Sequence, residues 1–234
     1  MSSLRQVRFL LCKDLRVELR KKESLVSMAF FGALILVILN IATGIGKQVD
    51  AETGAGILWV AVIFSSVLGL GRVFAREKEN GCVAALLISP AAPWEIYVAK
   101  ALVNFTLMTL SELVLVPVFY VLFGAQLNGD PLNLVPILLL VNLGFSVTGT
   151  LISAISAGTR RNEVLLPILL FPLLLPLIAL AVKATSAALA AQPFSELLDQ
   201  LEPMAAFCVI FAAVGYLLFP FAIRGDCSDN YESF

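Results

Sequence analysis

Long apolar runs separated by short polar connections dominate the pattern of this chain. A helix needs about 20 mostly apolar residues to cross a bilayer, and six of the runs are long enough. They lie near residues 24–43, 55–72, 98–123, 132–158, 164–182 and 204–223. This pattern predicts an all-α integral membrane protein, with six transmembrane helices in one domain over residues 24–223.

Residues 1–23 precede the first run and have a pattern of their own. Apolar side chains recur there every three or four positions, at Leu4, Val7, Leu11, Leu15 and Leu19, and seven Lys or Arg residues fill much of the rest. A helix of this kind lies in the membrane interface with its cations near anionic headgroups. We therefore expect an interfacial amphipathic helix on the cytoplasmic side, a reading compatible with a simple topology signal.

The basic residues are distributed unevenly between alternate connections. Fourteen of the 16 Lys and Arg residues fall on one set of connections, and the other set holds only Lys47 and Lys183. Connections rich in Lys and Arg stay in the cytoplasm. Both termini, with the tail 224–234, and residues 77–97 are therefore expected to be cytoplasmic. Residues 124–131 are expected outside.

Composition narrows the class of function. The chain is 59% hydrophobic and 14% charged, whereas a soluble domain is about 45–50% apolar and about 25% charged. It has no histidine, which excludes a His-based general base, a His–metal site and a His-ligated haem within this chain. It also has no phosphate-binding G-x-x-x-x-G-K-[ST] motif. We therefore expect a non-catalytic membrane subunit that binds no metal or cofactor itself, with any ATP bound by a partner.

Residues 77–90, EKENGCVAALLISP, interrupt the apolar pattern between the second and third runs. They combine a charged exit from the membrane, a glycine turn, about two turns of helix with one apolar face, and a proline that ends the helix. The residues concerned are Glu77, Glu79, Gly81, Val83, Leu86, Leu87 and Pro90. Such a helix can insert into a groove on a soluble partner or lie on the membrane surface, and the pattern leaves both readings open.

Glu112 is a carboxylate deep in the third run. An ionised carboxylate at that depth is costly unless it is protonated, paired or facing water. It is either a gating or substrate-path group, or a neutral or hydrogen-bonded carboxyl at a helix–helix contact, and the second reading is slightly favoured.

The fifth run, LPILLFPLLLPLI, contains Pro167, Pro172 and Pro176. Each proline removes a backbone donor and clashes with the preceding turn, so we expect this helix to be kinked or broken. It offers no polar side chain to hold a substrate, and we interpret it as a mechanically weak hinge.

The connection at 77–100 resembles the cytoplasmic loop of ABC-2 type exporter permeases. The shared pattern is E-x-E-x-G, then Leu-Leu and Pro, then E-I-x-x-x-K, and its last part here is Glu95, Ile96 and Lys100. In that class the loop contains a coupling helix docked on a separate ATPase subunit.

A narrower resemblance covers nearly the whole chain. GILWVAVIFSSVLGLGRVF at 56–74 and the proline-rich fifth run are similar to the permease subunits of the cytochrome c maturation system, the haem exporter B family. A His-Trp pair is frequent early in the third span of that family, whereas this chain has Asn104 and Phe105.

This resemblance implies an ATP-driven complex in the inner (plasma) membrane of a bacterium. Its other members would be an ABC ATPase subunit and haem-handling membrane subunits, and it would deliver haem to a periplasmic haem chaperone or release the loaded chaperone. We expect the haem iron to be ligated by a partner subunit, membrane lipid to surround this chain, and no nucleic acid to bind it. The alternatives are an ABC-2 exporter permease for another hydrophobic or polymeric substrate, and a scaffold or intramembrane enzyme without ATPase coupling.

Overall fold

The computed structural model describes residues 3–45, 49–79, 92–123, 130–157 and 162–228, and all regular structure in these ranges is helical. The helices are α1 (Ser3–Lys21), α2 (Glu23–Thr43), α3 (Ala51–Glu79), α5 (Pro93–Phe123), the short 3₁₀ helix η2 (Pro131–Asn133), α6 (Leu134–Ala157), α7 (Asn162–Leu189) and α8 (Phe194–Ser228). Six of them, α2, α3, α5, α6, α7 and α8, are long and apolar enough to cross a membrane. The prediction of an all-α membrane protein with six spanning helices is confirmed.

Several helices extend beyond the apolar runs. α5 begins at Pro93 rather than near residue 98, α7 continues to Leu189, and α8 begins at Phe194 rather than near residue 204. α3 continues to Glu79, through the charged residues expected to form the exit from the membrane. Glu, Lys and Arg are good helix formers, so a helix need not end where its apolar run ends.

Short-range hydrogen bonds fix the starts of two helical segments. The carboxylate of Asp50 accepts from the backbone N–H of Thr53 (3.0 Å) and from its hydroxyl (2.7 Å) at the start of α3. These bonds hold the pKa of Asp50 below its ordinary value. Asp130 accepts from the N–H of Leu132 (2.9 Å) at the start of η2. Both carboxylates satisfy N–H groups that the first turn leaves without a partner.

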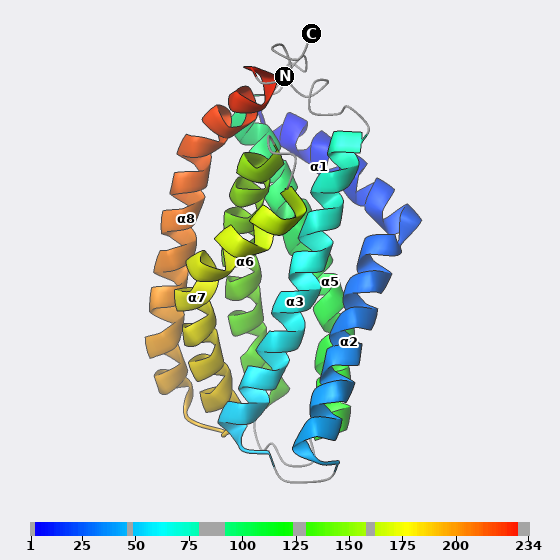
Figure 1. Ribbon diagram of the computed structural model, residues 1–234. Helices are drawn as coiled ribbons and strands as arrows, with labels where there is room; N and C mark the ends of the chain where they lie inside the picture. Colours follow the sequence, from blue (N-terminus) through cyan, green and yellow to red (C-terminus); the bar gives the residue numbers. More distant parts are fainter. Residues whose placement is uncertain (1–2, 46–48, 80–91, 124–129, 158–161, 229–234) are drawn as a thin grey trace.

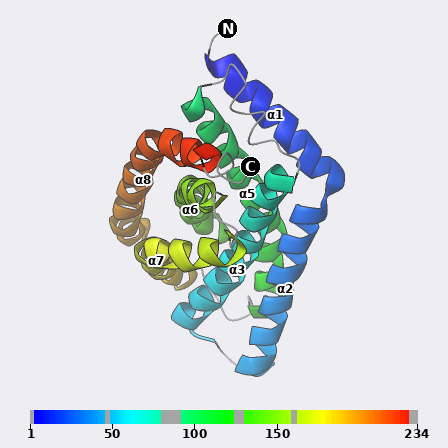
Figure 2. The ribbon, with the colours of Figure 1, turned by 45° about the horizontal axis from the view of Figure 1, so that its top comes forward.

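α6 occupies the centre of the bundle. Figure 2 shows it surrounded by α3, α5, α7 and α8, each of which packs against it. Many of its buried side chains are small and polar, including Ser146, Thr148, Thr150 and Ser153. Small residues let neighbouring helices approach closely, which explains how one helix can have four neighbours.

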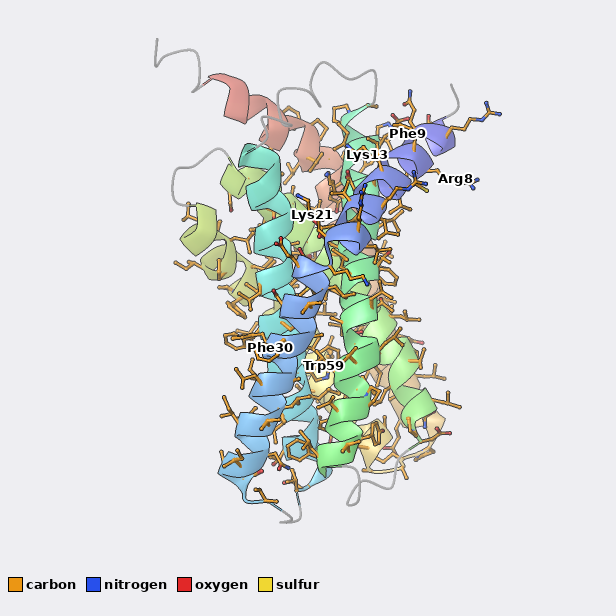
Figure 3. All side chains as sticks on the ribbon, turned by 90° about the vertical axis from the view of Figure 1, so that its right-hand side faces the viewer. Arg8, Phe9, Lys13, Lys21, Phe30 and Trp59 are labelled. Carbon is orange, nitrogen blue, oxygen red and sulfur yellow. The ribbon has the colours of Figure 1, made fainter. Side chains whose placement is uncertain are left out.

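Exposure separates the lipid-facing surface from the interior of the bundle. Phe30 on α2 is 70% exposed, whereas Trp59 on α3 is 1% exposed and donates its ring N–H to the hydroxyl of Thr185 (2.9 Å). Figure 3 marks both side chains on the ribbon. The large apolar residues that remain exposed are those that the surrounding lipid would cover.

The helix ends gather at two opposite ends of the bundle. The upper end of Figure 1 holds α1, the first turns of α5 and the last turns of α8, and the lower end holds the C-terminal ends of α2 and α7. This alternation agrees with six successive crossings. α1 lies obliquely across the upper end, with Arg8, Lys13 and Lys21 along it in Figure 3.

Candidate functional site

Most of the predicted coupling loop lies outside the described residues. Gly81, Val83, Leu86, Leu87 and Pro90 fall in the range 80–91, for which the structure gives no description. The backbones of Glu77 and Glu79 belong to the last turns of α3, and their side chains are likewise not described. The described part of this region is therefore the start of α5, which follows the loop directly.

The first turn of α5 is built around Glu95. Its side chain, 3% exposed, accepts a hydrogen bond from the backbone N–H of Ala92 (2.9 Å). This bond, from the third helical residue back to the N-cap N–H, is one half of a capping box, and Pro93 suits the first helical position because its φ is already fixed. The amide of Gln6 on α1, oriented with its nitrogen toward Glu95, donates to the same carboxylate (3.1 Å to Oε1).

A second polar contact joins α1 to α5 further along both helices. The Nζ of Lys100 lies 2.7 Å from Oδ2 of Asp14, and Lys100 is 6% exposed. Asp14 is also 3.2 Å from the ammonium of Lys13, which is much more exposed. The two charged residues of the E-I-x-x-x-K motif, Glu95 and Lys100, therefore both contact α1. The sequence did not predict these contacts.

Tyr97 anchors the start of α5 to the other side of the bundle. The structure buries it between α6 and α8. Its hydroxyl donates to the carbonyl of Val147 (3.0 Å), and its ring centroid lies 5.2 Å from that of Phe219. Position 215 is glycine because a Cβ there would overlap the ring and hydroxyl of Tyr97.

Three polar contacts join α5 to α6 at successive helical turns, and we call them the α5–α6 polar ladder. Asn104 donates to Thr150 (3.0 Å), Ser146 donates to the sulfur of Met108 (3.8 Å), and Asn142 donates to Glu112 (2.6 Å). The α5 positions rise by four while the α6 positions fall by four, as expected for antiparallel helices in one register.

Glu112 therefore lies at a helix–helix contact. Glu112 is 3% exposed and Asn142 is fully buried. The Nδ2 group of Asn142 also reaches the hydroxyl of Thr109 (3.2 Å), so one amide bridges two positions of α5. Sequence reasoning missed Asn142, although an asparagine inside a long apolar run is a signal in itself.

A small cavity lies beside the ladder, lined by residues of α2, α3, α5 and α6. Its walls include Asn104, Met108, Met28, Ser66 and Phe145, and its volume is about 10 Å³. About that much space holds one water molecule, whereas small-molecule sites occupy about 300–1,000 Å³. This cavity is therefore too small for an organic ligand.

The three prolines of the fifth run lie within α7, which the structure describes as one continuous helix. In Figures 1 and 2 its first part lies across the bundle and the rest runs beside α8, so the helix is bent. Leu170, Leu174 and Leu177 face the interior, whereas Pro172 and Pro176 are exposed. A proline ring widens the side of the helix that carries it, so the bend directs α7 around the bundle. The hinge role stays a prediction.

Comparison with known proteins identifies the family. The sequence profile of the CcmB protein family matches residues 5–226, almost the whole chain. The chain belongs to the CcmB family. It is 28% identical to heme exporter protein B of Pseudomonas aeruginosa over 214 residues, which cover 92% of each chain. It is 32% identical to heme exporter protein B of Rhodobacter capsulatus over 173 residues, covering 73% of this chain and 78% of the relative. With the protein of that name from Escherichia coli K12, identity is 29% over 176 residues, covering 75% and 79%.

The structure places the polar residues of α5 in two groups. Asn104, Met108 and Glu112 form one edge of the polar ladder. Glu95 and Lys100 both contact α1, through Gln6 and Asp14 respectively. The prolines of α7 lie apart from both groups. Among the described residues, no group of three or more His, Cys, Asp or Glu side chains is placed to hold a metal ion.

Proposed function

We propose that this chain is the permease subunit of an ABC-type haem exporter complex that serves cytochrome c maturation, driven by ATP hydrolysis on a separate subunit. The observation that carries the proposal is the CcmB match over residues 5–226, together with the name heme exporter protein B borne by relatives that align along most of their length. The six spanning helices support a permease rather than a soluble factor.

ATP hydrolysis reaches the bundle through residues 77–90. Their apolar face, formed by Val83, Leu86 and Leu87, fills a groove on the ATPase, and Gly81 and Pro90 delimit the helix. The loop is continuous with the last turns of α3 and the first turn of α5. The start of α5 contacts α1 through Lys100 and α6 through Tyr97. A displacement of the loop therefore moves several helices together.

The haem iron is ligated by another subunit. This chain has no histidine, and the polar side chains of the α5–α6 polar ladder are buried and bonded to a neighbouring helix, which keeps them from haem propionates. The sulfur of Met108, a candidate soft ligand, is buried and accepts a hydrogen bond from Ser146. The chain acts as a mechanical subunit whose motion serves haem delivery or release of a loaded periplasmic chaperone. The bent α7, with Pro167, Pro172 and Pro176, is its hinge.

The distribution of charge supports the orientation in the membrane, and the bacterial relatives support a bacterial membrane as its location. Both termini face the cytoplasm of a bacterium with the chain in its inner membrane, and α1 lies in the cytoplasmic interface. The exposed side chains of Arg8, Lys13 and Lys21 on α1 then lie near lipid headgroups.

Gene deletion in the native bacterium, followed by complementation, tests this function. Loss of covalently bound haem from c-type cytochromes, restored by the wild-type gene, is expected. Affinity purification of a tagged chain from membranes should also recover an ATPase with a Walker A motif and haem-containing membrane proteins. Normal c-type cytochromes in the deletion strain, with export of a polymer or lipid lost instead, would contradict the proposal.

A further inference from the structure

The contact between Glu112 and Asn142 leaves two buried oxygen atoms without a hydrogen-bond donor. Oε2 of Glu112 accepts from Nδ2 of Asn142 at 2.6 Å. Oε1 of the same carboxyl and Oδ1 of the same carboxamide have no hydrogen-bond partner within the described structure. Two acceptors on two groups that already touch are therefore unsatisfied, and buried polar atoms are normally hydrogen-bonded.

The neighbouring hydroxyl groups do not supply the missing donor. Thr109 gives its hydroxyl proton to the carbonyl of Phe105 (2.9 Å), and Ser111 gives its own to the carbonyl of Met108 (2.8 Å). Ser146 donates to the sulfur of Met108 (3.8 Å). These three hydroxyl donors are therefore already used.

The ionisable side chains of the neighbouring helices do not supply it either, and Lys183, the only Lys or Arg in α7, is exposed. α6 has no ionisable residue, α2 has only Glu23 at its first position, and α3 has none between Glu52 and Arg72. On α5 itself, Lys100 is three turns away and pairs with Asp14, and the phenol of Tyr120 is two turns away on the other side. On α8, Cys208 donates its thiol proton to the carbonyl of Leu140 (3.2 Å), and Tyr216 packs beside Trp94.

We propose that Glu112 is a proton-binding site: its carboxyl is protonated at neutral pH and forms a closed ring of two hydrogen bonds with Asn142. The acid O–H on Oε1 donates to Oδ1 of Asn142, and Nδ2 of Asn142 donates to Oε2. One proton satisfies both unpartnered oxygens and removes the charge from the interior of the bundle. The ring holds α5 against α6 without an ion pair. This inference is independent of what the complex transports.

Infrared spectroscopy of the purified chain in lipid bilayers tests the proposal directly. The C=O stretch of a protonated carboxylic acid is resolved from the bands of ionised carboxylates and backbone amides. The chain has 17 Asp and Glu residues, and at neutral pH we expect an acid band equivalent to one residue. Labelling the glutamate carboxyls with ¹³C should shift that band.

Glu112→Gln should abolish the acid band while preserving the ring, because the glutamine amide donates to Oδ1 and accepts from Nδ2. Glu95→Gln is the matched control: Glu95 is also 3% exposed, but its carboxylate accepts from the N–H groups of Ala92 and Gln6 and needs no proton of its own to make these bonds. It should leave the band unchanged.

A second variant keeps the carboxyl in place in case Glu112→Gln does not fold. Asn142→Ala should retain the acid band and move it to higher wavenumber, because the C=O group loses its donor. Absence of an acid band from the wild-type spectrum at neutral pH would overturn the proposal. So would a band that persists unchanged in Glu112→Gln.

Discussion

Lys100→Met is the sharpest perturbation of the contact between α1 and α5. Methionine keeps most of the length of the lysine side chain and removes its charge, so Asp14 loses its closest described cation. Lys100 is 6% exposed and its Nζ lies 2.7 Å from Oδ2 of Asp14. The substitution therefore tests whether this buried pair holds α1 to the start of α5.

The geometry of the Lys100–Asp14 pair sets the size of the expected loss of stability. At 2.7 Å and an effective dielectric constant of about 20, Coulomb's law gives an attraction of about 6 kcal/mol, most of which desolvation offsets. Removing one partner of a buried pair costs about 3–5 kcal/mol. The Asp14 side chain keeps 15% of its surface exposed and retains Lys13 at 3.2 Å. We therefore expect Lys100→Met to lower the free energy of unfolding by about 2–3 kcal/mol, at or just below the lower end of that range for buried pairs.

A double-mutant cycle with Asp14→Asn, measured by reversible unfolding in mixed micelles, isolates the pair. The coupling energy should be about 1–3 kcal/mol, a typical value for contacting residues. Lys13→Met is the control, since the Lys13 side chain is 52% exposed and exposed pairs contribute about 0–1 kcal/mol. Equal effects of Lys100→Met and Lys13→Met, with no coupling to Asp14, would refute the reasoning.

Three further predictions concern packing, topology and the proline-rich helix. Gly215→Ala should lower the free energy of unfolding by about 1–3 kcal/mol, because the added Cβ overlaps Tyr97. The control Gly56→Ala has open space around the added carbon and should change the free energy of unfolding little. Equal losses of stability in thermal or micelle unfolding would contradict this. A single cysteine at Asn128 should react with a membrane-impermeant reagent in intact cells and one at Asn80 should not; the reverse labelling would overturn the orientation. Replacing Pro167, Pro172 and Pro176 by Ala restores three backbone donors, so the variant should be at least as abundant in membranes but should mature fewer c-type cytochromes; unchanged maturation would remove the hinge.

The helices themselves could be predicted from local pattern, because an apolar run of sufficient length has few alternatives in a bilayer. The six spans were predicted in this way, and so was the position of Glu112 deep in the third span. The predicted helix ends were less accurate. α3 continues through the charged segment from Arg72 to Glu79, because Glu, Lys and Arg favour helix in water as well.

The partners of the buried polar groups could not be predicted, because they depend on which helices pack together. Asn142 lies 30 positions from Glu112 and Asp14 lies 86 positions from Lys100. No local pattern specifies such pairings. The four-residue spacing of Asn104, Met108 and Glu112 is visible in the sequence, but its meaning depends on the matching spacing in α6.

The most direct test of the central claim is co-purification of the ATPase with a chain carrying Leu86→Asp and Leu87→Asp. Burying a carboxylate against an apolar groove costs at least about 2 kcal/mol, and each 1.4 kcal/mol lowers the affinity about tenfold. Leu86→Ile with Leu87→Ile is the matched control. We expect the Asp variant to insert into membranes at normal abundance, to lose the ATPase on purification and to leave c-type cytochromes without haem, while the Ile variant behaves as wild type. An Asp variant that retains its ATPase and supports cytochrome assembly would contradict the account.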